Sequence, residues 1–230
     1  MSKGQLAGID ADQSVQSGVE PVFLIDRPKG EARATLILAH GAGAPMDSPF
    51  MQQMAERLMA RGLAVFRFEF AYMAERRAGG GKRPPNPQAQ LLQQWRDAYA
   101  TVRQQTAGRL AIGGKSMGGR MASLVADELE ADALVCLGYP FYAAGKPEKP
   151  RVAHLAELRT PTLILQGERD ALGNRETVSG YSLSSAVTVD WLAAADHDLK
   201  PLKRLGLTHE QHLETAADAI TVFLGHPLNG

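Results

Sequence analysis

The chain has 230 residues, enough for one substantial hydrophobic core, and 44% of them are hydrophobic and 22% charged, as in a globular domain. Its 25 basic and 25 acidic residues give a formal net charge of zero, so the overall charge favours neither nucleic acid nor an anionic membrane as a partner. No stretch approaches the roughly eighteen apolar residues of a membrane span. The single cysteine, Cys136, cannot form an intrachain disulfide, and we interpret it as a small buried hydrophobe.

The N-terminal residues are polar and rich in Gly, Ser and Gln. They contain no apolar core of a secretory signal, so we expect a cytoplasmic protein. We further expect a flexible segment over residues 1–18 and a single domain over residues 19–230.

Short apolar runs recur along the chain between turn signals, and each is typical of a strand. The run 34–39 is continuously apolar, which favours a strand buried on both faces. The expected strands are 19–26, 34–39, 63–70, a short one before Gly113, 133–137, 162–166 and 187–192.

Helical patterns alternate with these runs. Apolar residues recur at three- and four-residue steps in 49–61 and 88–105. Further helices are expected at 121–130, 152–158 and 208–224, the last capped by Thr208. Residues 71–87 are expected to form a long loop, and residues 139–151 a connection. This alternation predicts a three-layer α/β/α sandwich with a mostly parallel sheet of about six or seven strands.

One stretch combines a strand end with a reactive residue: Gly114-Lys115-Ser116-Met117-Gly118. The Gly-x-Ser-x-Gly spacing is typical of a nucleophile elbow, in which serine occupies a strained strand-to-helix turn between small neighbours. Such a turn presents the hydroxyl at a helix N-terminus, where free N–H groups favour negative charge. We therefore predict that Ser116 is a nucleophile.

Two more polar residues follow later strands. Asp170 comes shortly after the strand 162–166, and His197 shortly after the strand 187–192. Because ligands of open α/β sheets lie beyond the carboxyl ends of the strands, we expect both to meet Ser116 there. His197 would accept the serine proton, and Asp170 would orient the imidazole. Three rival carboxylates lie nearby: Glu168, Asp196 and Asp198.

This chemistry also requires an oxyanion hole, for which two backbone N–H groups are candidates. Met117 N–H is next to the nucleophile, and Ala42 N–H lies in the turn His40-Gly41-Ala42-Gly43, directly after the strand 34–39. We interpret His40 as a structural brace of this turn. We expect substrate contacts from Gly41, Gly43, Tyr72, Arg76, Arg77 and Tyr139.

The chain resembles the α/β-hydrolase superfamily, in particular its small dienelactone-hydrolase-like branch. The order Ser, Asp, His along the chain matches that superfamily, and the resemblance covers residues 19–224. Dienelactone hydrolases carry cysteine as the nucleophile, so Ser116 argues against that lactone activity. The residues that carry the resemblance are His40-Gly41-Ala42-Gly43, Gly114 to Gly119, Gly167-Glu168-Arg169-Asp170 and Asp196-His197.

A second resemblance keeps a non-catalytic alternative open. The turn 40–44, the segment 68–73 and the following Arg76-Arg77 are similar to a poorly characterised bacterial group. That group is in turn similar to a scaffold subunit of a eukaryotic acetyltransferase complex. A binding or scaffold protein on a hydrolase fold is therefore one hypothesis.

The main hypothesis is a serine hydrolase, an esterase on small or medium acyl esters that forms an acyl-enzyme on Ser116. A thioesterase or acyltransferase would use the same triad. We expect a small-molecule acyl substrate and neither a metal nor an organic cofactor. Only 54 residues separate Ser116 from Asp170, which leaves no room for a large cap domain and predicts an open, shallow site.

Several other polar residues have two interpretations. Arg76, Arg77, Lys82 and Arg83 would form an ordinary solvated loop or would favour a carboxylate- or phosphate-bearing substrate. For His209 and His212, three residues apart on the last helix, we favour a solvated face over a metal site. Lys115 is expected to point away from the nucleophile and to have no role.

Overall fold

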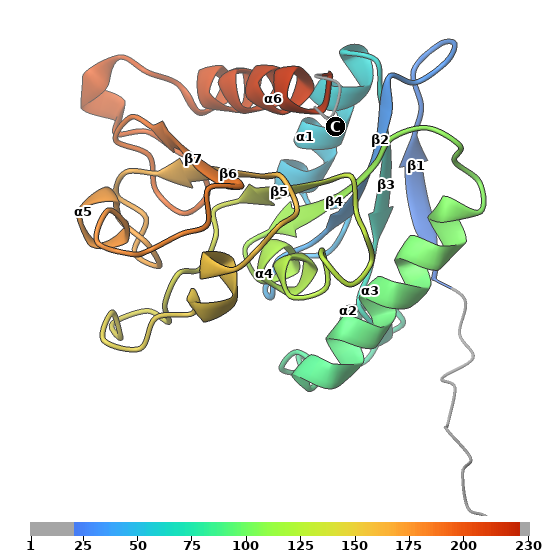
Figure 1. The fold of residues 1–230 in the computed structure, drawn as a ribbon, viewed down its shortest axis with the longest axis horizontal. Helices are drawn as coiled ribbons and strands as arrows, with labels where there is room; N and C mark the ends of the chain where they lie inside the picture. Colours follow the sequence, from blue (N-terminus) through green and yellow to red (C-terminus); the bar gives the residue numbers. More distant parts are fainter. Residues whose placement is uncertain (1–20, 226–230) are drawn as a thin grey trace, which may run out of the picture.

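The computed structural model describes residues 21–225 (Figure 1). The expected flexible segment 1–18 and the first residues of the expected strand 19–26 lie outside the described residues. Within the described part, no helix combines the length and the apolar character needed to cross a membrane.

The centre of the fold is a seven-stranded sheet, formed within the described residues, with the order β1-β3-β2-β4-β5-β6-β7. All neighbouring strands are parallel except β1 and β3, which pair antiparallel. This confirms the predicted mostly parallel sheet. The strands are β1 (Phe23–Asp26), β2 (Ala34–Ala39), β3 (Leu63–Phe68), β4 (Leu110–Lys115), β5 (Ala133–Leu137), β6 (Thr162–Gly167) and β7 (Val187–Leu192).

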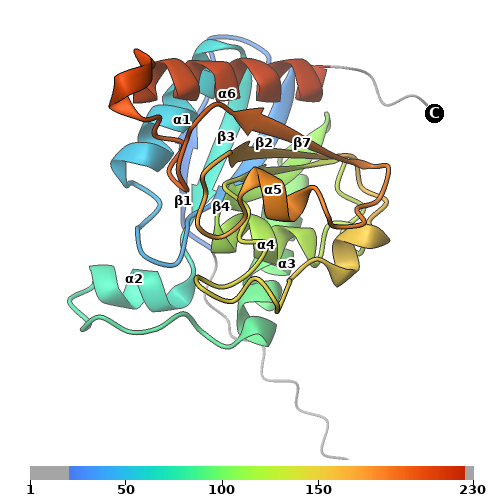
Figure 2. The ribbon, with the colours of Figure 1, turned by 90° about the vertical axis from the view of Figure 1, so that its left-hand side faces the viewer.

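Helices cover both faces of the sheet (Figure 2). Helices α1 (Pro49–Ala60) and α6 (His209–Gly225) pack on one face, and α3 (Gln88–Arg103) and α4 (Met117–Ser123) on the other. Strand β2 shows why both faces must be covered: Ile37 joins one core cluster, whereas Leu36 and Leu38 join the other. The three-layer sandwich predicted from the sequence is confirmed.

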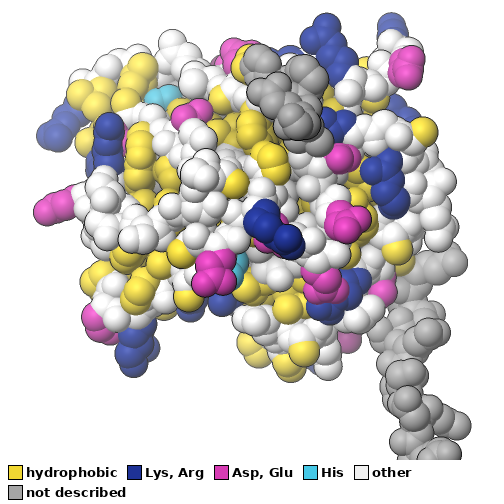
Figure 3. Space-filling view, in the orientation of Figure 1, with side chains coloured by type: hydrophobic (Ala, Val, Ile, Leu, Met, Phe, Trp, Pro, Cys, Tyr) yellow, Lys and Arg dark blue, Asp and Glu magenta, His cyan; other side chains and the backbone are white. Residues whose placement is uncertain are grey.

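Charged side chains of both signs are interspersed on the face shown in Figure 3, without a large patch of one sign. Several of them join elements that are distant in the sequence. Arg61, next to α1, forms ion pairs of 2.6 and 2.7 Å with Glu214 and Asp218 of α6. These charges therefore support the packing of one helix against another.

Three predictions of local structure were wrong. The segment 71–87 is not a loop throughout, because Ala71–Arg77 form α2, which is too short for its periodicity to be recognised. Helix α4 begins at Met117, directly after the nucleophile candidate, and not at residue 121, since the glycines at its start weaken the helical signal. Helix α5 (Arg175–Val178) was not predicted.

Most other boundaries agree within a few residues, but α4 ends at Ser123 and not at residue 130. The segment 152–158 contains a short 3-10 helix, Ala153–Ala156, and a second one covers Lys203–Leu205. Thr208 caps α6 as predicted, because its hydroxyl accepts a hydrogen bond from Gln211 N–H at 3.1 Å. The Gln211 side chain in turn accepts one from Thr208 N–H at 2.8 Å, which completes a capping box.

The core packing can be tested at Phe68, which is 1% exposed and whose ring lies 4.8 Å from that of Trp95 and 5.2 Å from that of Phe70. We expect Phe68→Ala to lower the free energy of unfolding by about 3–5 kcal/mol, because it leaves a cavity beside the Trp95 and Phe70 rings. Urea denaturation measures the change. Val222→Ala, at a position that is 60% exposed, serves as the control; its expected effect is below about 1 kcal/mol. A small loss for Phe68→Ala would contradict this assignment of the core.

Candidate active site

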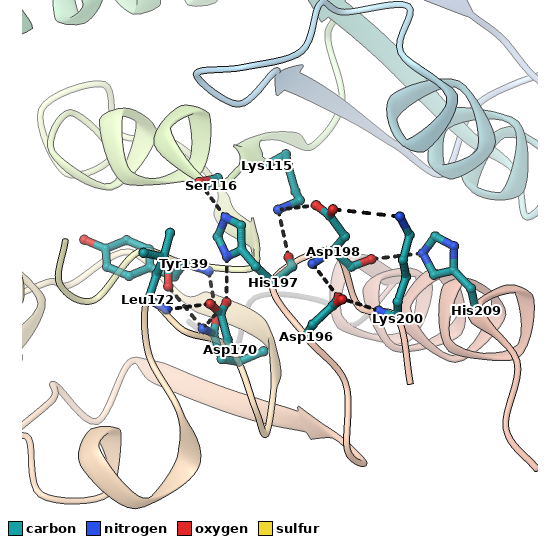
Figure 4. Close-up of polar contacts among 11 residues, drawn as sticks. Lys115, Ser116, Tyr139, Asp170, Leu172, Asp196, His197, Asp198, Lys200 and His209 are labelled. Carbon is teal, nitrogen blue, oxygen red and sulfur yellow. Dashed lines mark hydrogen bonds and ion pairs between the residues drawn. The ribbon is translucent and has the colours of Figure 1, made fainter. Parts of the chain in front are cut away.

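The three predicted catalytic residues meet beyond the carboxyl ends of three parallel strands (Figure 4). Ser116 follows β4, Asp170 follows β6 and His197 follows β7. His197 Nε2 lies 2.8 Å from Ser116 Oγ, and His197 Nδ1 lies 2.7 Å from Asp170 Oδ2. The structure therefore connects the three side chains in the order that activation of a serine requires.

The turn that carries Ser116 is strained. Ser116 has φ 53° and ψ −117°, a conformation that side-chain-bearing residues rarely adopt, and it caps α4 at its N-terminus. A Cβ atom at Gly114 would lie 2.6 Å from the carbonyl carbon of Gly118, and a Cβ atom at Gly118 would lie 2.6 Å from the carbonyl oxygen of Ala39. The two glycines of the motif are needed because three backbone segments approach each other at this turn.

Asp170 is fully buried, and its carboxylate is held on both oxygens. Leu172 N–H donates to Oδ1 at 2.8 Å, and the Gln166 amide donates to Oδ2 at 2.8 Å. Gln166, itself fully buried, also accepts from Tyr139 N–H at 2.7 Å. Sequence reasoning missed Gln166, although its place at the end of a buried strand was a signal. These contacts fix the carboxylate that orients His197.

The rival carboxylates have other partners. Glu168 accepts from Ala194 N–H at 2.9 Å and pairs with Arg175 at 2.7 Å. Asp196 accepts from the N–H groups of Asp198 and Lys200, both at 2.9 Å, and so shapes the loop that presents His197. Asp170 is the carboxylate that contacts the imidazole.

Lys115 makes several contacts at the site, whereas the sequence analysis expected it to have no role. Its ammonium group donates to the main-chain oxygen of His197 at 2.8 Å, lies 3.4 Å from an Asp198 carboxylate oxygen and sits above the Phe50 ring at 5.5 Å. Burial lowers the pKa of Lys115, and the Asp198 carboxylate opposes that lowering. The residue before the nucleophile therefore anchors the loop of the histidine.

The glycine turn after β2 is braced from behind. His40 is fully buried: its Nδ1 lies 2.6 Å from the Gly41 carbonyl oxygen, and its Nε2 accepts from Phe70 N–H at 3.1 Å. Burial lowers the pKa of His40, which agrees with a neutral ring in this role. The Tyr72 hydroxyl donates to the Ala42 carbonyl at 3.1 Å, so Tyr72 holds the turn as His40 does.

The turn itself and the start of α4 are open. Ala42 and Gly43 are exposed, and Ser116 and Met117 are partly exposed. Among the described residues, neither Ala42 N–H nor Met117 N–H donates to another protein group. Two cavities of about 690 and 700 Å³ lie elsewhere, beside the amino ends of the parallel strands. The catalytic candidates are thus on an open surface.

The other expected substrate contacts are placed differently. Arg77 forms ion pairs of 2.8 Å with both Asp47 and Glu69, so its charge is already compensated. Tyr139 is fully buried, and its hydroxyl donates to the Arg151 carbonyl at 3.2 Å. Arg76 is partly buried beside Tyr72. Of the other basic residues of this segment, Arg83 pairs with Glu75 at 2.9 Å, and Lys82 is exposed.

The histidines of α6 do not form a solvated face. His212 is buried and its Nδ1 lies 3.0 Å from the Leu199 carbonyl, whereas His209 Nε2 lies 2.9 Å from the Asp198 carbonyl. Both side chains therefore hold the segment after His197 against α6. The described residues contain no cluster of three or more His, Cys, Asp or Glu that would suit a metal ion.

A second serine–histidine pair joins α4 to the 3-10 helix Ala153–Ala156. Ser123 Oγ is 2.8 Å from His154 Nε2, but its own proton is donated to the Arg120 carbonyl at 2.8 Å. Ser123 is 2% exposed, and no carboxylate contacts His154 within the described part of the chain. This pair lacks the access and the orienting acid of a nucleophilic site.

Comparison with known proteins places this geometry in a family. The model of the alpha/beta hydrolase domain family matches residues 32–225, which is most of the chain. The chain is an alpha/beta hydrolase. The matched region contains all three members of the Ser116–His197–Asp170 triad.

Solved structures of other hydrolases share the fold. A dienelactone hydrolase from Anabaena variabilis is 19% identical, with a TM-score of 0.67 over 92% of this chain and 100% of that one. Est1E from Butyrivibrio proteoclasticus, solved with ferulic acid, is 17% identical, with a TM-score of 0.68 over 90% of this chain and 95% of that one. An α/β serine hydrolase without lid from Xanthomonas campestris is 20% identical, with a TM-score of 0.63 over 87% and 95%. At these identities, the likeness shows the fold of the hydrolase.

The partly buried His154 predicts how the stability of the hydrolase depends on pH. Burial, helped by Arg120, lowers its pKa from 6.5 to about 4. Between these values the unfolded chain binds the proton more tightly than the folded one, so the stability present at neutral pH is lost as the pH falls from about 6.5 to 4. Between pH 7 and pH 5, we expect the melting temperature of the His154→Gln variant to fall less than that of the native hydrolase. Equal losses in thermal scans would contradict the assignment.

The anchor formed by Lys115 can be tested through the reactivity of Ser116. We expect Lys115→Met to slow modification of Ser116 by a fluorophosphonate by about tenfold or more, because His197 loses a charge-assisted contact to its backbone. Lys115→Arg should retain part of the rate. Lys200→Met, at an exposed lysine 3.9 Å from Asp198, is the control and should react at the native rate. An unchanged rate in a folded Lys115→Met variant would show that the contact is dispensable.

Proposed function

We propose that the chain is a serine hydrolase that cleaves carboxylic esters of small or medium acyl groups through an acyl-enzyme on Ser116. The observation that carries the proposal is the unbroken connection from Ser116 Oγ through His197 to the buried carboxylate of Asp170. The open surface around Ser116 supports a substrate that approaches without a large cap.

The first step is the attack on the ester carbonyl. Ser116 Oγ forms a bond to the carbonyl carbon while its proton moves to His197 Nε2, and the electron pair of the C=O bond moves to the oxygen. Asp170 stabilises the imidazolium and keeps His197 Nδ1 protonated. The N–H groups of Met117 and Ala42 are the donors that we assign to the oxyanion, and each such donor contributes about 3–4 kcal/mol in related chemistry.

The next steps release the products. The C=O bond re-forms, the bond to the alkoxide oxygen breaks, and His197 Nε2 returns the proton to the leaving alcohol. Water then attacks the acyl-enzyme, gives its proton to His197 and releases the carboxylic acid together with the native serine. The strained backbone of Ser116 keeps its hydroxyl within reach of His197 throughout.

Two alternatives use the same residues differently. A thioester or an acyl acceptor other than water would need no change of the triad, so thioesterase and acyltransferase activity remain alternative hypotheses. A non-catalytic scaffold would have no need for the Asp170–Gln166 contacts or for the strained Ser116. The intact set of contacts supports the catalytic proposal over the scaffold.

The proposal predicts that Ser116→Ala abolishes covalent labelling by a fluorophosphonate probe, and that His197→Ala lowers turnover of p-nitrophenyl hexanoate by about 10⁴-fold or more. Asp170→Asn should also lower turnover strongly, because the imidazole loses its orienting partner. Ser123→Ala is the matched control, since Ser123 also contacts a histidine, and it should retain labelling and turnover. A folded native protein that is neither labelled nor active on oxygen esters or thioesters would favour the scaffold alternative.

A further inference from the structure

Many arginines in the described part of this hydrolase lie within ion-pair distance of a carboxylate. Arg67 pairs with Asp26 at 2.9 Å, and Arg96 pairs with Glu128 at 2.6 Å. Arg120 on α4 differs: among the described residues no carboxylate lies within ion-pair distance of its guanidinium, and its buried Nε has no hydrogen-bond partner. Its side-chain contact is a long one, 3.5 Å from Nη2 to the Gln88 amide oxygen.

The electrostatic surroundings of Arg120 leave its charge uncompensated. Burial lowers the pKa of its guanidinium, and the nearby Arg151 lowers it further. His154, which also lies nearby, is neutral at pH 7, because its pKa is lowered to about 4. Arg120 is partly buried, and its Nε is shielded from solvent. Removing a cation even partly from water without an anionic partner is unfavourable, so the position is suited to an anion that comes from outside the chain.

Arg120 lies one helical turn from the nucleophile. Its N–H donates to the Ser116 carbonyl at 3.0 Å, so the two residues share one side of the start of α4. Gln88 begins α3 at the end of the segment after β3, and Arg151 belongs to the connection after β5. Arg120 therefore lies at the same end of the sheet as Ser116, between two of the segments that border the site.

The polar neighbours of Arg120 cannot serve as its counter-ion. The Ser123 hydroxyl donates to the Arg120 carbonyl, and the Tyr139 hydroxyl donates to the Arg151 carbonyl. Because both hydroxyl protons are used in these bonds, His154 Nε2 donates to the hydroxyl oxygens of Ser123 and Tyr139, at 2.8 and 3.4 Å. These contacts use the two hydroxyls and His154 Nε2, and none of them brings a negative charge to the guanidinium.

We propose that Arg120 binds a carboxylate of the substrate, so that the preferred substrates are esters that carry a free carboxylate in addition to the scissile bond. The inference rests on the proposed esterase function. A planar guanidinium offers parallel N–H donors that match the two oxygens of a carboxylate. Arg77, the stronger candidate in the sequence, is occupied by Asp47 and Glu69.

The test compares esters of equal acyl length with and without the charge. The pair for an acyl-side carboxylate is the mono-p-nitrophenyl ester of adipic acid and p-nitrophenyl hexanoate. The pair for a leaving-group carboxylate is 4-carboxyphenyl hexanoate and phenyl hexanoate. The ratio of kcat/KM within each pair is measured for the native hydrolase, Arg120→Gln, Arg120→Lys and the control Arg96→Gln, which removes an equal charge from an exposed ion pair.

We expect the native hydrolase to prefer the charged ester in one of the two pairs, and Arg120→Gln to lower that preference by about tenfold or more. Arg120→Lys should restore part of it, and Arg96→Gln should leave it unchanged. The pair of esters in which this preference appears shows whether the acyl group or the leaving group of the preferred substrate carries the carboxylate. Arg120→Gln should also melt no lower than the native protein, because it removes a partly buried charge that has no carboxylate partner.

Three results would overturn the inference. The first is turnover of neutral esters with no charge preference in either pair. The second is a preference that Arg120→Gln leaves intact. Either of these would leave the proposed serine chemistry standing. The third, absence of both ester turnover and fluorophosphonate labelling in the native protein, would overturn the proposed function and the inference with it.

Discussion

The tight approach of three backbone segments at the β4–α4 turn is the constraint on which the rest of the site depends. A Cβ atom at Gly114 would clash with the backbone of Gly118, and one at Gly118 would clash with the backbone of Ala39 at the end of β2. Ser116 itself is held at a positive φ. This strain places the serine hydroxyl toward His197 and the first N–H groups of α4 toward the open surface. It also sends Lys115, the preceding residue, in the other direction, where it reaches the backbone of His197. One turn thus positions both Ser116, the proposed nucleophile, and the lysine that anchors the loop of His197.

A second set of contacts links the loops that the sheet brings together. Gln166 at the end of β6 contacts Asp170 on its own loop, as well as the main-chain N–H and carbonyl of Tyr139 after β5. Asp196 shapes the loop after β7, and the carbonyl of His197 receives Lys115. Because each loop is tied to its neighbour by buried or partly buried hydrogen bonds, the geometry of the triad is a property of the whole sheet edge and not of three separate turns.

Residue order and strand ends were enough to predict the sheet and that Ser116, Asp170 and His197 lie together, because both depend on patterns that are local in the sequence. The apolar runs gave the strands, the glycine spacing gave Ser116, and the positions after strands gave Asp170 and His197. What failed depends on contacts between distant residues. The pairing of Arg77 with Asp47, the burial of His212 and the contacts of Lys115 are set by packing across elements, for which the sequence has no periodic signal. Helix α4 was misplaced for a local reason, since its glycines are poor helix formers that tertiary packing nevertheless requires.

Charge pairing also separates residues that support the fold from residues that are free to select a ligand. Arg77 is attractive in the sequence because it stands in a basic segment, yet two carboxylates hold it against the turn after β2. Arg120 is unremarkable in the sequence, yet folding brings it beside Arg151 and a neutral histidine without an acid. An arginine without a carboxylate partner contributes little to stability through its charge, so it needs another reason to be there. Its place one turn from Ser116, at an open edge of the sheet, is why we propose recognition of a charged ester as that reason.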